Sequence, residues 1–148
     1  MPSSEAAAII EKLSLIPHPE GGWYRETWRA QANSEGGVRG TAIHFLLEAG
    51  QRSHWHKVSE ADEIWFWHAG APLTVSIAES DTGPITRHAL GPDVLDDQSP
   101  QVRVPAGFWQ SSDPFVNAAE SWSLVSCVVV PGFEFANFEL APPEWSPG

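Results

Sequence analysis

The chain has 148 residues, of which 42% are hydrophobic and 18% are charged, a composition typical of a folded globular protein. At this length one hydrophobic core forms without disulfides or a structural metal, and we expect a single domain over residues 1–148. The formal net charge is -11. Such a charge repels phosphate backbones and anionic headgroups, so we expect neither nucleic acid nor a membrane surface as a partner.

The beginning of the chain and its cysteine content predict a location. The first residues lack the basic segment of a secretory signal, and no apolar run reaches the roughly 18 residues of a membrane span. Cys127 is the only cysteine, so the chain cannot form an internal disulfide. These features favour a cytoplasmic protein.

Two kinds of periodicity divide the chain. Residues 4–15 are expected to form a short helix, because apolar residues recur there at helical spacing. Beyond the His-Pro-Glu-Gly-Gly turn at residues 18–22 the period changes to two, and runs rich in aromatic and β-branched residues predict strands. These runs cover residues 23–28, 41–47, 63–68, 73–78, 101–104 and 122–130. Short strands joined by turns favour a sandwich or barrel, followed by a loose Pro-rich tail over residues 141–148.

Two histidines and a carboxylate suggest a metal site. His54 and His56 are two residues apart, which in a regular strand places both rings on one face. If that strand pairs with the run that begins at Glu63, the Glu63 carboxylate lies beside the two imidazole rings. Two neutral imidazoles and one carboxylate suit Fe, Mn, Ni, Zn or Cu. On a polar surface hairpin the same histidines would instead lie in solvent.

Two short motifs resemble those of cupins. The first consists of Gly50, the triplet His54-Trp55-His56, Glu63 and Gly70, and the second of Pro105-Ala106-Gly107 followed by Gln110. Longer phrases at residues 18–27, 62–65, 104–110 and 130–133 resemble the fifth cupin family, catalogued as a domain of unknown function, over about residues 13–140. The resemblance implies an all-β double-stranded β-helix, or jelly roll, with a short N-terminal helix, often assembled as a homodimer.

The resemblance also implies how a metal would be held. Gln110 stands where the second motif has a histidine, which gives the ligand set His54, His56, Glu63 and Gln110. A glutamine oxygen is a weaker ligand than an imidazole, so the affinity would be moderate. Glu60 has the more usual distance from the histidines, but Glu63 keeps the usual distance to Gly70 and is preferred.

Other residues are candidates for the wall of a pocket. Trp65 and Trp67 share the face of Glu63, and Trp109 is a further candidate. Tyr24 and Arg25 are also substrate-binding candidates, and Arg25 is an alternative anion anchor in a chain with eight basic residues. The remaining histidines are expected to be structural or exposed, and they are His18, His44, His68 and His88.

Three functions are consistent with this pattern. Similarity to jelly-roll epimerases and isomerases implies an enzyme for a small polar, sugar-like molecule, with His56 as base or ligand and Glu63 as its catalytic partner. A metal-dependent oxygenase or lyase would use the four-residue metal site. A non-catalytic protein would bind a small molecule in an aromatic-lined cavity without a metal.

Overall fold

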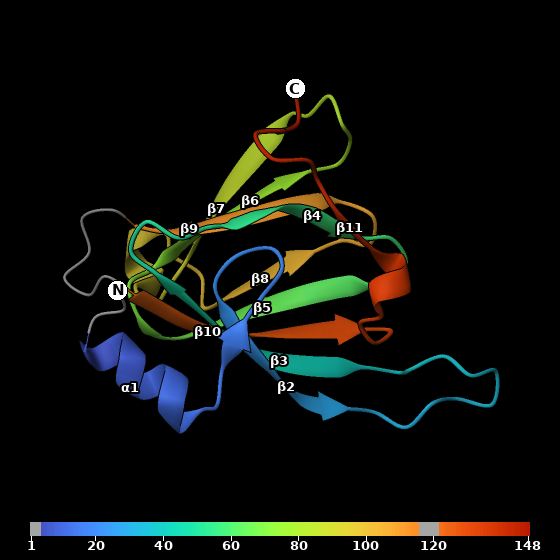
Figure 1. Cartoon of the computed structure of the whole chain (residues 1–148). Coiled ribbons are helices and arrows are strands. Elements are labelled where there is room, and N and C mark those ends of the chain that lie inside the picture. Colours follow the sequence, from blue (N-terminus) through green and yellow to red (C-terminus); the bar gives the residue numbers. More distant parts are fainter. Residues whose placement is uncertain (1–3, 116–121) are drawn as a thin grey trace.

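The computed structural model describes residues 4–115 and 122–148, and two antiparallel sheets face each other in it (Figure 1). One sheet has the strand order β1 (Ile16–Pro17), β2 (Trp23–Arg29), β3 (Thr41–Glu48), β10 (Trp122–Val130), β5 (Asp62–Gly70) and β8 (Gln101–Val104). The other has the order β11 (Phe138–Leu140), β4 (Ser53–Val58), β9 (Trp109–Pro114), β6 (Leu73–Ala78) and β7 (Ile85–Leu90). The predicted all-β jelly roll with a short N-terminal helix is confirmed.

The helix α1 (Ser4–Lys12) ends three residues before the predicted boundary at residue 15. Ser14 adopts a left-handed backbone with φ of 57°, and the Leu15 N–H donates back to the Ile10 carbonyl over 2.9 Å. This pattern closes a helix and turns the chain away from it. Leu15 and Ala6 then pack with Leu46 against the outer face of the first sheet.

The predicted strands are present, and the described residues form five more. Residues 73–78, 101–104 and 122–130 coincide with β6, β8 and β10, while the other three runs lie within β2, β3 and β5. β4 contains the His54-Trp55-His56 triplet, which was considered as part of a strand. The sequence pattern does not predict β1, β7, β9 or β11: β1 and β11 have two and three residues, and β9 is rich in serine and ends at a proline. Two short 3-10 helices, Val94–Asp96 and Phe135–Asn137, lie in the connections.

The space between the sheets is filled at one end and open at the other. Apolar side chains from both sheets, among them Phe45, Trp65, Val75 and Val125, form the main core. Toward the other end, the inward-facing residues of β3, β4, β5 and β10 surround a cavity instead. The fold therefore provides a packed base and a hollow end.

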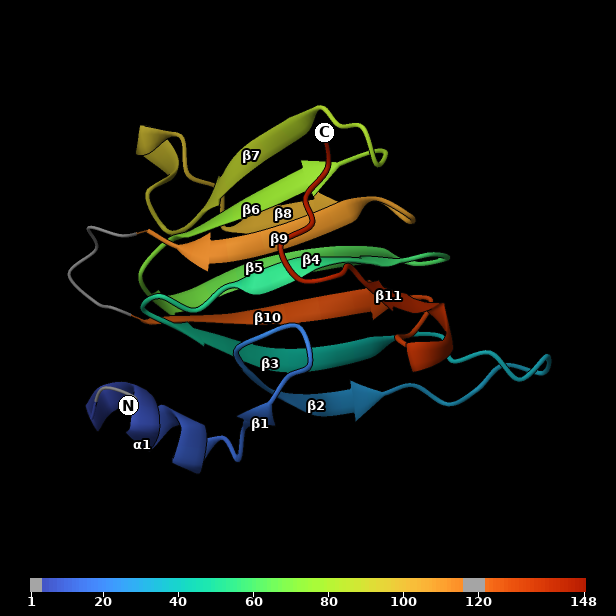
Figure 2. The same cartoon turned by 45° about the horizontal axis from the view of Figure 1, so that its top comes forward.

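The C-terminal segment 141–148, expected to be loose, lies across the outer face of the second sheet (Figure 2). The Ala141 N–H donates to the Trp55 carbonyl and the Gly148 N–H to the Asp81 carbonyl, each over 2.9 Å. Trp145 stacks on Trp109 with 4.6 Å between ring centroids. These contacts hold the segment against β4 and β9.

Candidate functional site

A tight loop between β1 and β2 brings a carboxyl group into the cavity. Gly21 and Gly22 have φ of 112° and 80°, conformations that favour glycine. A side chain at Gly21 would overlap the Arg52 carbonyl oxygen, so only glycine allows the loop to lie this close to β4. The His54 N–H donates to the Glu20 carbonyl over 2.7 Å and fixes the loop there. The Glu20 side chain therefore points inward.

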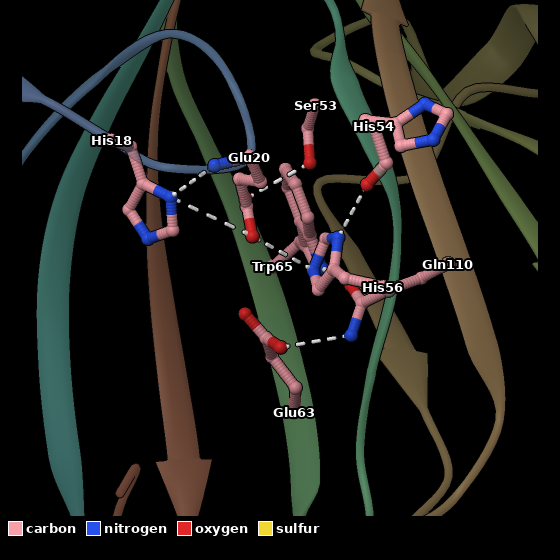
Figure 3. A network of polar contacts seen from close by, with 8 residues as sticks. All are labelled: His18, Glu20, Ser53, His54, His56, Glu63, Trp65 and Gln110. Carbon is pink, nitrogen blue, oxygen red and sulfur yellow. Dashed lines mark hydrogen bonds and ion pairs between the residues drawn. The ribbon is translucent and has the colours of Figure 1, made fainter. Parts of the chain in front are cut away.

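Glu20 and His56 form the central contact of the site (Figure 3). His56 Nε2 lies 3.1 Å from Glu20 Oε2, and the two residues are 2% and 8% exposed. Glu20 Oε1 accepts a hydrogen bond from Ser53 Oγ over 2.9 Å. His56 Nδ1 lies 2.7 Å from the His54 carbonyl oxygen, which can only accept, so this nitrogen carries a proton. One further proton is thus shared between Nε2 and Oε2.

A second carboxyl group, Glu63, is held by a chain of two hydrogen bonds. The Trp65 indole N–H donates to Gln110 Oε1 over 2.8 Å, which fixes the orientation of the amide. The amide nitrogen then donates to Glu63 Oε1 over 2.9 Å. All three residues are buried. Glu63 is therefore positioned on the side of His56 opposite β4, with its other oxygen turned into the cavity (Figure 3).

Burial favours the uncharged forms of the ionisable groups around His56. It raises the pKa of Glu20 to about 8, so the protonated form of this carboxyl predominates at pH 7. Burial also raises the pKa of Glu63 and lowers the pKa of His56. The pKa of His18 falls to about 4, first because of burial and then because His56 is near. A protonated acid facing a neutral imidazole is the form that these shifts favour.

The cavity has a volume of about 140 Å³ and a polar floor with apolar walls. His18, Glu20, His56 and Glu63 form the floor, and the Glu20 N–H donates to His18 Nδ1 over 3.1 Å. The walls are made by Tyr24, Thr41, Ile43, Val58, Cys127, Val129, Phe133 and Phe135. The small volume suits a compact ligand rather than one of drug size.

An ion pair lines the exposed part of the cavity. Arg29 Nη2 lies 2.7 Å from Glu26 Oε1 and also donates to the Phe133 carbonyl over 3.0 Å. Both charged side chains are more than a third exposed, so solvent screens the pair. Among the residues that line this cavity, Arg29 is the cation that a ligand would meet first.

The structure brings five of the predicted site residues to the cavity or its supports. His56, Glu63 and Tyr24 line it, and Gln110 and Trp65 hold Glu63 in place. Glu60 lies on the exposed turn after β4 and does not contact the cavity. The roles of ligand or catalyst assigned to these residues stay predictions.

His54 does not share a face with His56, contrary to the expectation for a regular strand. Ser53 pairs with Ser112 and His56 with Gln110, so β4 contains one residue more than β9 between these pairs. Such a bulge reverses the alternation. The His54 ring points out of the sandwich and its Nε2 lies 2.9 Å from the Pro142 carbonyl oxygen (Figure 3).

Three further candidates lie away from the cavity. Arg25 follows the inward-facing Tyr24 and is exposed on the opposite face of β2. Trp109 neighbours the inward-facing Gln110 and packs with Trp55 on the outer face of β9. Trp67 shares the inner face but packs in the core, where its indole N–H donates to the Ala71 carbonyl over 3.1 Å. None of them contributes to the lining.

Most residues of the cavity lining were not predicted from the sequence, and His18, Glu20 and Arg29 matter most among them for its chemistry. Glu20 and His18 come from the loop after β1, and His18 was expected to be structural or exposed. The signal that could have indicated them is the pair of glycines at 21–22, which marks a tight turn beside two ionisable residues. Arg29 was missed because a second bulge, between Glu26 and Trp28 in the β2–β3 pairing, turns it inward.

The donors that were expected to hold a metal do not converge. His54 points outward, His56 Nε2 contacts Glu20, and the Gln110 oxygen already accepts from Trp65. Over residues 4–115 and 122–148, no three His, Cys, Asp or Glu side chains are placed to hold a metal ion. The residues present therefore do not fit the metal that the resemblance implied.

The comparisons with known proteins agree on the fold. The model of the family described as "Cupin superfamily (DUF985)" matches residues 7–141. A solved structure from Shewanella oneidensis is 39% identical, with 92% of this chain and 84% of that chain covered and a TM-score of 0.82. A hypothetical protein from Leishmania major is 35% identical, with 92% and 86% covered and a TM-score of 0.81.

A more distant likeness shows the fold alone. A mutant of Bacillus subtilis oxalate decarboxylase is 16% identical, with 88% of this chain and 31% of that chain covered and a TM-score of 0.63. Among curated proteins, no sequence matches this chain. No helix in the described part of the chain is long and apolar enough to cross a membrane.

Proposed function

The chain belongs to the DUF985 family of the cupin superfamily, and from its cavity we propose that it is an enzyme of the isomerase or epimerase type. It moves a proton on a carbon next to a carbonyl group in a small polar substrate. The observation that supports this proposal is the buried contact between His56 Nε2 and Glu20 Oε2, which shares one proton. Glu63 faces the same space and supplies the second acid group.

The paired groups can change roles without a net change in charge. When the shared proton moves from Glu20 to His56, the carboxyl becomes a carboxylate and the ring becomes an imidazolium. The Glu20 carboxylate then takes a proton from the substrate carbon as the general base. Return of a proton to the opposite face of the same carbon gives the epimer, and delivery of a proton to the neighbouring carbon gives the isomer.

Glu63 is placed to stabilise the charge that develops on the substrate. Burial raises its pKa and so favours the protonated carboxyl, which can donate a hydrogen bond to the carbonyl oxygen. The bonds from Trp65 to Gln110 and from Gln110 to Glu63 fix its direction before substrate arrives. The apolar walls exclude water and strengthen these interactions.

The cavity favours a short polyhydroxy carbonyl compound as substrate. Its volume of about 140 Å³ limits the ligand to a few carbon atoms. In neutral His18 the proton lies on Nε2, because Nδ1 accepts from the Glu20 N–H, and this donor has no protein partner in the described part of the chain. The Tyr24 hydroxyl also lines the cavity. Both groups are available to substrate hydroxyls.

We expect the protein to exchange hydrogen for deuterium next to the carbonyl group of short aldoses and ketoses. The reaction is followed in D2O by proton NMR. The variant Glu20→Gln keeps hydrogen bonds to His56 and Ser53 but cannot become a carboxylate, so its exchange rate is expected to fall by about 100-fold or more. The control Glu60→Gln makes the same chemical change on the exposed turn and should retain the rate.

An unchanged rate in Glu20→Gln would contradict the assignment of the base. Saturable binding of the sugars without any exchange would instead support a non-catalytic binding protein, the alternative that needs no proton transfer.

We further propose that the protein is a homodimer whose second copy covers β2. Among the described residues this strand pairs with β1 at Trp23 and Tyr24, and the rest of that edge has no strand partner. Trp28 on the same strand is 53% exposed. Free edges and exposed aromatic rings are commonly covered by a partner. Light scattering at micromolar concentration should give twice the 16.2 kDa mass of the chain, and a monomeric mass would contradict the proposal.

A further inference from the structure

A polar groove of about 590 Å³ lies on the outer face of the second sheet. The segment 141–148 crosses this face (Figures 1 and 2). Its residues Glu144, Trp145 and Ser146 line the groove, and Trp55, Ile85 and Trp145 contribute the apolar part of the lining. The sheet separates this groove from the interior cavity, because His56 and Gln110 occupy the inner face of the same strands. The groove is therefore a separate site.

Its floor contains two serine hydroxyls without partners. Ser76 pairs across the sheet with Arg87 on one side and with Ser111 on the other, so the three form a row. Ser76 and Ser111 are 5% and 1% exposed, and neither hydroxyl has a hydrogen-bond partner in the described ranges of the chain. Because both hydroxyls line the groove, a bound molecule can satisfy them.

The charged groups of the groove balance one another. Arg52 and Arg87 line it together with Asp113 and Glu144, and none of the four forms an ion pair within the described residues. The groove is thus neutral as a whole, although the chain carries a net charge of -11. It offers planar guanidinium donors, carboxylate acceptors and hydroxyl groups that do both. The two carboxylates offset the attraction of the two arginines for an anion, whereas a neutral molecule rich in hydroxyls matches the whole set.

We propose that this groove binds a neutral saccharide. Vicinal hydroxyls of a sugar ring present two adjacent donors and acceptors, which suit the bidentate geometry of carboxylate and guanidinium groups. The C–H face of the ring can lie against the Trp145 indole, which is only partly buried. The volume lies within the roughly 300 to 1,000 Å³ of ligand pockets. The proposal does not depend on the reaction assigned to the interior cavity.

The test titrates the full chain with neutral methyl glycosides and follows the tryptophan indole signals by NMR. Wild type is expected to show saturable shifts of the Trp145 and Trp55 signals. Arg87→Ala and Ser111→Ala should each weaken the binding about tenfold or more. Arg25→Ala is the matched control. Arg25 is also an exposed arginine on a strand, but it lies on the outer face of the first sheet, whereas the groove lies on the second sheet. Glu20→Gln should bind as wild type does, which separates this site from the interior cavity.

Three outcomes would overturn the proposal. One is the absence of any shift at the highest soluble glycoside concentrations. Another is binding that Arg87→Ala and Ser111→Ala leave unchanged. The third is a stronger effect of inorganic phosphate on the same signals, because this would make the groove an anion site.

Trp145→Phe retains an aromatic ring against Trp109 and should keep part of the affinity even if Trp145→Ala displaces the segment.

Discussion

Replacing Glu20 with glutamine is expected to make the protein more stable than wild type at pH 8, although the variant loses a group of the candidate site. The folded-state pKa of Glu20 is raised to about 8 from an ordinary value of 4.5, with burial as the main cause. Between these two values the folded protein binds a proton that the unfolded chain has released. The contribution of Glu20 to the free energy of unfolding of wild type therefore falls as pH rises from 4.5 to 8.

Glutamine does not titrate and has the shape of the protonated acid. Its amide can donate to His56 Nε2 while its oxygen accepts from Ser53 Oγ, so the fold should tolerate it. Near pH 5 the two proteins should have similar free energies of unfolding. At pH 8 the variant should exceed wild type by roughly 2–4 kcal/mol. Urea unfolding at a series of pH values measures the difference.

The contribution of His18 to the acid side of the profile should be common to both proteins. The folded-state pKa of His18 is lowered to about 4, so the unfolded chain binds the extra proton between pH 4 and 6.5. The His18 contribution to the free energy of unfolding should fall as pH drops through this window in both proteins, but in wild type the Glu20 contribution opposes it above pH 4.5. Glu60→Gln removes the same charge from an exposed turn and should follow wild type. Parallel profiles for wild type and Glu20→Gln up to pH 8 would show that Glu20 is ionised in the folded protein.

The sequence predicted the strands better than the faces of the strands. Six runs of apolar and β-branched residues correspond to strands because burial in a sandwich imposes a period of two. Two bulges explain the main errors at the site. One in β4 turns His54 outward, and one in β2 turns Trp28 outward and Arg29 inward. A bulge depends on the register with the partner strand, which the residue types of a single strand do not indicate.

The partner of His56 could not be found from local spacing. Glu20 lies 36 positions earlier in the chain, in a loop rather than a strand, and reaches the cavity only because the fold brings that loop beside β4. By contrast, Glu63 and Trp65 were placed correctly on one inward face, since β5 alternates regularly over these residues. Prediction from the sequence therefore succeeded where alternation holds and failed where a turn or a bulge decides direction.

The loop that carries Glu20 should be the part of the site most sensitive to a small substitution. Gly21→Ala forces a side chain onto a backbone with φ of 112° and against the Arg52 carbonyl oxygen, which cannot move without disturbing β4. We expect the free energy of unfolding to fall by about 3 kcal/mol or more, because both backbone strain and a steric overlap oppose the change.

Gly36→Ala separates these two causes. Gly36 also has a left-handed backbone, with φ of 92°, but a side chain there would meet no atom within 4 Å. Its substitution should cost only the strain, on the order of 1 kcal/mol. Denaturant unfolding compares the stabilities of the two variants. The assay of hydrogen-deuterium exchange on the sugar substrates reports whether Glu20 still reaches His56. Equal losses of stability would mean that the loop does not lie tightly against Arg52. A large loss in Gly21→Ala alone, accompanied by loss of exchange, would show that this close contact positions the proton shared by Glu20 and His56.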